Sequence, residues 1–142
     1  ERFSVAENKW EHISALPFGV FNHSVIVQES TQSLFVLGGE ACLHTIGGMP
    51  VASFTDVIQV LSFETFLWKQ LSFTLPSKDN SRCIPIFKSS SNSDELFFIH
   101  DSKLYLWNPS SAPRLIKSLS ANIRSRYGPS YYSRGTVYCS NH

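Results

Sequence analysis

The residues that most often bind metals or act as nucleophiles are few and widely separated in this chain. It has five histidines and three cysteines in 142 residues, and the tightest grouping is Cys42-Leu43-His44. Zinc sites use three or four such ligands, usually supplied in closely spaced pairs, and this grouping has no second pair near it in the sequence. Gly38-Gly39 and Gly47-Gly48 do not form a Gly-x-Gly-x-x-Gly motif. We therefore expect no metal site, no cofactor and no catalytic residue.

A second group of residues could bind an anionic partner. Basic and aromatic side chains are interleaved at Arg124, Arg126, Tyr127, Tyr131, Tyr132 and Arg134. Aromatic rings stack on bases beside phosphate-binding cations, and Arg binds the carboxylates or phosphates of a peptide equally well. A third interpretation places the tyrosines in a β-core. We favour the core interpretation, then acidic-peptide binding, then nucleic-acid binding.

The overall charge argues against general binding of polyanions, because the net charge is only +1. The distribution is uneven, however. Residues 1–101 hold 6 Lys/Arg and 11 Asp/Glu, a balance of −5, whereas residues 102–142 hold 6 Lys/Arg and no Asp/Glu, a balance of +6. Two interpretations stay open: an acidic surface lies beside a basic one, or further parts of the same domain even out the charge.

The elements that must position these residues are short β-strands. Apolar runs recur about every ten residues between Ser, Gly and Pro clusters, which is typical of all-β proteins, and 42% of the residues are hydrophobic. Prolines at 85, 109, 113 and 129 would break any helix in the second half. We expect strands at residues 23–27, 34–38, 57–61, 68–73, 83–87, 96–99, 103–107, 114–119, 131–132 and 136–139.

Three scattered cysteines predict no disulfide framework and indicate a reducing compartment. The sequence has no apolar stretch of about 18 residues, so we expect no transmembrane helix. These features favour a cytoplasmic or nuclear protein that does not enter a membrane.

Residues 33–71 resemble a kelch repeat, which forms one blade of a β-propeller. The run Leu34-Phe35-Val36-Leu37 closes on Gly38-Gly39, a turn follows at residues 61–65, and Trp68 stands seven residues after Leu61. A weaker second copy starts at Trp107-Asn108-Pro109 and places Arg114 46 residues after Trp68, but it lacks the glycine pair. Trp10, Trp68 and Trp107 fall at repeat positions, which predicts that they pack between blades.

The resemblance implies an all-β fold of four-stranded antiparallel blades in an incomplete ring. We assign residues 1–16 to the outer strand of a preceding blade, 17–75 and 76–120 to two blades, and 121–142 to half a blade. Propellers usually need four to eight blades to protect their strand edges. We therefore expect either a larger propeller or a second chain that completes the ring.

The function that the resemblance implies is a non-catalytic protein–protein interaction module, as in ubiquitin-ligase substrate adaptors and scaffolds. The alternative is an accessory kelch-like domain of an RNA-modifying enzyme, such as a tRNA methyltransferase, with its basic last third facing RNA. We expect residues 40–55 to form a long partner-binding loop. The candidate contact residues are Glu40, His44, Met49, Arg124, Arg126, Tyr127 and Arg134, and the expected partner is another protein or an acidic peptide.

Overall fold

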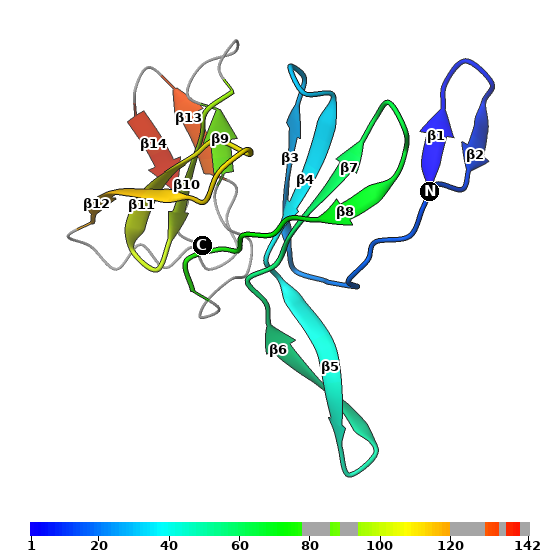
Figure 1. Ribbon diagram of the computed structural model, residues 1–142, viewed down its shortest axis with the longest axis horizontal. Helices are drawn as coiled ribbons and strands as arrows, with labels where there is room; N and C mark the ends of the chain where they lie inside the picture. Colours follow the sequence, from blue (N-terminus) through cyan, green and yellow to red (C-terminus); the bar gives the residue numbers. More distant parts are fainter. Residues whose placement is uncertain (78–85, 89–93, 120–129, 134–135, 140–142) are drawn as a thin grey trace.

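The computed structural model describes residues 1–77, 86–88, 94–119, 130–133 and 136–139 (Figure 1). These residues form antiparallel β-strands joined by turns, so the all-β prediction is confirmed. In this part of the chain no helix is long and apolar enough to cross a membrane.

The first sheet contains four strands in the order in which they pair. They are β3 (Ser24–Gln28), β4 (Ser33–Leu37), β7 (Ile58–Ser62) and β8 (Trp68–Gln70). The central strand β4 is almost wholly apolar, and Phe35, Val36 and Leu37 are all buried, as expected for a strand covered on both faces. Five residues, 63–67, join β7 to β8.

The second sheet repeats this arrangement. Its strands are β9 (Ile86–Lys88), β10 (Leu96–His100), β11 (Lys103–Trp107) and β12 (Arg114–Ser118), again with each strand paired to the next. Arg114 begins the fourth strand of this sheet as Trp68 begins the fourth strand of the first, which agrees with the predicted repeat of 46 residues.

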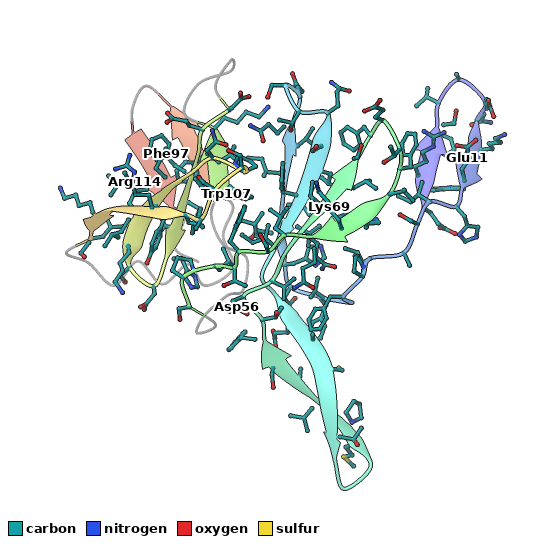
Figure 2. All side chains as sticks on the ribbon, in the orientation of Figure 1. Glu11, Asp56, Lys69, Phe97, Trp107 and Arg114 are labelled. Atoms are coloured by element: carbon teal, nitrogen blue, oxygen red, sulfur yellow. The ribbon has the colours of Figure 1, made fainter. Side chains whose placement is uncertain are left out.

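The hydrophobic core lies between these two sheets. The first sheet supplies Phe35, Leu37, Ile58 and Val60, the second supplies Leu96, Phe98, Tyr105 and Trp107, and Leu75 comes from the segment that joins them. Trp107 is fully buried there, and its indole N–H donates to the Ser111 carbonyl oxygen at 3.0 Å. Figure 2 places Trp107 on the side of the second sheet that faces the first. The predicted packing role of Trp107 is therefore confirmed.

Two-stranded hairpins lie on either side of the two sheets (Figure 1). The N-terminal hairpin pairs β1 (Arg2–Ser4) with β2 (Lys9–Glu11), and the C-terminal hairpin pairs β13 (Ser130–Ser133) with β14 (Thr136–Cys139). The predicted strand around Trp10 is present, but its packing role is wrong. Trp10 is 68% exposed, because it contacts only the Phe3 ring of its own hairpin among the ring pairs described, at 5.3 Å between centroids.

Residues 40–55 are a β-hairpin, so the prediction of a long loop is wrong. Strand β5 (Glu40–Ile46) pairs with β6 (Met49–Phe54) through the two-residue turn Gly47-Gly48. Both glycines have positive φ, +57° and +80°, which a tight hairpin turn of this kind requires and which glycine adopts without strain. This projecting hairpin leaves the first sheet between β4 and β7 and extends away from both sheets (Figure 1).

Candidate interaction surface

The projecting hairpin is anchored to the first sheet at the glycine pair. Gly38 and Gly39 have φ of +60° and +95°. A side chain at Gly39 would place its Cβ 2.6 Å from the Phe21 carbonyl oxygen. This distance is an atomic overlap, and glycine avoids it because it has no Cβ. The close approach arises because Phe21 and Glu40 exchange two backbone hydrogen bonds, of 2.9 and 2.8 Å, directly beside Gly39.

The strands of the hairpin continue the β4–β7 pair through a bulge. The Gly38 N–H donates to the Val57 carbonyl oxygen at 3.0 Å, and the Thr55 N–H donates to the Gly39 carbonyl oxygen at 3.0 Å. Asp56 is the extra residue between these two bonds. A bulge bends the strand that contains it, and Asp56 marks the point where the hairpin leaves the sheet (Figure 2). The hairpin is therefore fixed at its base by backbone geometry.

The second sheet shows that this hairpin is an addition to the basic unit. At the same place, between the second and third strands, β10 turns directly into β11 through Asp101 and Ser102. Asp101 and Ser102 have φ of +49° and +55°. The turn of the second sheet therefore has positive φ values, as Gly38 and Gly39 do in the first sheet, although it contains no glycine. A two-residue turn is thus sufficient to close a sheet of this kind, and the first sheet carries residues 40–55 instead.

Beyond Glu40 at its base, the hairpin combines apolar and polar side chains that carry no formal charge. From Ala41 to Thr55 the sequence contains no Asp, Glu, Lys or Arg. Met49, next to the turn, is 73% exposed. An isolated two-stranded hairpin is marginally stable in water, and neither β5 nor β6 pairs with another strand of the described residues apart from the Phe21–Glu40 bridge at the base. The arrangement can supply exposed strand edges and apolar side chains to a binding partner.

The structure brings three of the predicted contact residues onto this one hairpin. Met49 is beside its turn, His44 is in the middle of β5, and Glu40 is at its base. The Glu40 side chain is only 6% exposed and accepts a hydrogen bond from the Asn22 amide at 3.0 Å, so it stabilises the base and is not part of the exposed surface. The other candidates, which are Arg124, Arg126, Tyr127 and Arg134, lie outside the described residues.

A groove of about 810 Å³ lies between the two sheets. Its lining includes Gln28 and Asp94, which are joined by a hydrogen bond of 2.9 Å from the Gln28 amide to the Asp94 carbonyl oxygen. The groove is thus part of the sheet–sheet contact. Among the residues with a described position, no cluster of three or more His, Cys, Asp and Glu side chains could hold a metal ion.

Neither a protein-family model nor a curated protein matches the chain. The kelch resemblance therefore stays a prediction, and the function is argued from the geometry.

Proposed function

We propose that this chain is a segment of a kelch-type β-propeller that binds another protein through its projecting hairpin and carries out no catalysis. One observation carries the proposal. The second and third strands are joined by a two-residue turn in the second sheet, whereas in the first sheet residues 40–55 stand at the equivalent place. An addition that the sheet does not need for closure, and that exposes uncharged apolar surface, is best explained by binding.

The arrangement of the first strands supports the propeller. Strand β3 of the first sheet is a neighbour of β9 of the second sheet, and β9 is also a neighbour of β13 of the C-terminal hairpin. In each case the neighbour is the first strand of its unit. Sheets that pack face to face with their first strands side by side radiate from a common axis, as the blades of a propeller do.

The hairpin favours a partner with an apolar surface or an open sheet edge. Exposed strand edges bind extended segments through backbone hydrogen bonds, and alternate side chains add specificity. Because residues 41–55 carry no formal charge, an acidic peptide would not be held by this hairpin. It would need the basic last third of the chain.

The alternative function, RNA binding by an accessory domain, is favoured by a separate observation. Strand β12 is exposed at every position and carries Arg114 and Lys117. Residues 102–142 contain no acidic residue that would repel phosphates. Binding through phosphate contacts weakens steeply with salt, whereas binding to an uncharged hairpin does not.

Site-specific photo-crosslinking tests the proposal. A photoreactive residue at Met49 is expected to give one discrete adduct in cells. The same residue at Leu67 is the matched control, because Leu67 is 61% exposed in the turn between β7 and β8, away from the projecting hairpin. The protein recovered in the Met49 adduct should bind the purified chain at both low and high salt. Equal adducts from both positions would contradict the proposal, and an RNA adduct from the same photoreactive residue at Ile116, on the exposed strand β12, would support the alternative.

A further inference from the structure

The outer edge of β5 begins a pairing with a third strand and does not continue it. At the base of the hairpin, Phe21 and Glu40 exchange backbone hydrogen bonds of 2.9 and 2.8 Å on the side of β5 that faces away from β6. The chain does not extend this pairing toward the hairpin tip, because the Gln59 side chain of the first sheet holds both backbone groups of Phe18. The next positions of the edge therefore have no strand beside them in the described part of the chain.

The direction of the backbone groups along β5 follows from these bonds. The Gly39 carbonyl oxygen accepts from the Thr55 N–H across the hairpin at 3.0 Å, whereas Glu40 bonds outward. Backbone groups of successive residues in an antiparallel strand point to alternate sides, so those of Ala41 face β6 and those of Cys42 face outward. Cys42 is exposed, so its N–H and carbonyl oxygen are accessible to a further strand.

Thr45 is a second outward-facing position on β5. One extra residue in β5 shifts the register before His44, so the alternation is counted again from the turn. Ile46 and Met49 flank the two-residue turn and pair with each other. Residues that flank such a turn exchange their hydrogen bonds. In the next pair, Thr45 with Pro50, the backbone groups therefore point away from the partner strand of the hairpin.

Pro50 closes the opposite edge of the hairpin. It stands at an outward-facing position of β6, where proline has no N–H to give to an added strand. Edge strands recruit strands from other chains unless proline or charged side chains prevent it. Residues 41–46 contain neither proline nor a charged residue. One edge of the hairpin is therefore closed to strand addition, and the other is open.

The outer strands of the two sheets carry the charges that β5 lacks. Lys69 lies in β8, and Arg114 and Lys117 lie in β12. Charged side chains of this kind protect a strand edge from pairing with another chain. The contrast singles out the edge of β5 from these outer strands.

We infer that an extended, uncharged segment of the partner protein adds to β5 as a third strand and pairs its backbone with Cys42 and Thr45. The inference rests on the proposed function and deepens it, because it names the edge and the kind of segment. The Phe21–Glu40 pair supports this occupant, since the same edge already accepts a neighbouring backbone. A charged segment is disfavoured, because residues 41–55 offer it no opposite charge.

Paired proline substitutions test the inference. Cys42 and Ala52 are opposite one another and exposed, and Ala52 faces outward because it lies two residues from Pro50. Proline at either position removes one amide that the hairpin itself does not use. In calorimetry with the purified protein recovered in the Met49 adduct, Cys42→Pro should weaken binding at least about tenfold, and the matched control Ala52→Pro less than about twofold. Cys42→Ser, which keeps the amide, should bind like the wild type.

Hydrogen exchange of the wild type supplies a measurement that needs no substitution. When the same purified protein binds, the amides of Cys42 and Thr45 should exchange more slowly, and the amide of Ala52 should not change. Unchanged exchange at Cys42 and Thr45 would overturn the inference.

The outcomes separate this inference from the proposed function. Unchanged binding in Cys42→Pro, or equal losses in both proline variants, would overturn the strand addition, while a discrete Met49 adduct would still support the proposed function. Absence of that adduct would overturn both. A dimer of the purified chain in native mass spectrometry that Cys42→Pro dissociates would also overturn the inference, because a second copy would then occupy the edge.

Discussion

The Trp107 indole meets the Phe35 ring edge to face, with ring centroids 5.3 Å apart and planes at 83°. The two residues belong to different sheets, so this contact joins one sheet to the next. Phe73, from the segment that links the sheets, adds a second edge contact to Trp107 at 6.4 Å. Aromatic pairs in this geometry stabilise beyond the area that they bury, so Trp107 is expected to be a main determinant of how the sheets pack.

Replacing Trp107 with Ala should lower the free energy of unfolding by about 3–5 kcal/mol, because it leaves a cavity between the sheets. Urea denaturation followed by circular dichroism measures the change. Trp10→Ala is the matched control and should cost less than about 1 kcal/mol, since Trp10 is mostly exposed. Equal losses from the two substitutions would contradict the assignment of the core.

Gly39→Ala should destabilise the protein by more than about 2 kcal/mol. The left-handed backbone alone costs a non-glycine residue about 1–2 kcal/mol, and the new Cβ would overlap the Phe21 carbonyl oxygen. Gly19→Ala, which meets no atom within 4 Å, should change stability by about 0.5 kcal/mol or less. Thermal unfolding of both variants checks this, and a neutral Gly39→Ala would rule out the described base of the hairpin.

Gln59 holds the segment that crosses from the N-terminal hairpin to the first sheet. Its amide donates to the Phe18 carbonyl oxygen and its carbonyl oxygen accepts from the Phe18 N–H, both at 2.8 Å. Gln59→Met should cost about 1–3 kcal/mol, because it leaves these backbone groups without their partner. The exposed Gln70→Met is the control. Faster hydrogen exchange at Phe18 in the first variant alone is the expected signature.

Tyr105 should make the free energy of unfolding depend on pH in the alkaline range. Burial is the main cause that raises the pKa of Tyr105 above its ordinary value of 10.0, Lys103 lowers it, and Asp101 raises it. As pH rises, Tyr105 ionises in the unfolded chain before it ionises in the folded protein. The folded state therefore loses stability between about pH 10 and the raised pKa, and this tyrosine causes no loss below about pH 10. Tyr105→Phe should lose less stability than the wild type between about pH 8 and pH 11 in urea titrations. Parallel losses would exclude this role.

The strands of both sheets could be predicted because their apolar runs are short, β-rich and bounded by turn residues. Residues 103–107 and 136–139 match the expected ranges, while others, such as 68–73, end earlier in the structure. The exposed face of β3, where Val25 is 53% and Val27 is 40% exposed, was not predictable, because it depends on the register between strands and on which sheet lies beside it. The sequence shows that Val25 and Val27 share a face, but not that this face is bare.

The projecting hairpin was missed although its signal is present. Gly47-Gly48 between two strand-compatible segments indicates a tight hairpin, but Pro50 and the mixed polarity of residues 40–46 obscured the alternation. The shared geometry of the two turns was also hidden. Asp101 and Ser102 adopt the left-handed values of the glycine pair, and a sequence motif records only glycine.

Removing the outer part of the projecting hairpin tests the central claim most directly. Deleting residues 42–46 and 49–52 joins Ala41 to Ser53, which already pair, through Gly47-Gly48. The account predicts a free energy of unfolding within about 1 kcal/mol of the wild type, since a two-residue turn closes the second sheet, together with a loss of at least about tenfold in affinity for the cross-linked partner by calorimetry. Unchanged affinity, or unfolding of the first sheet, would contradict it.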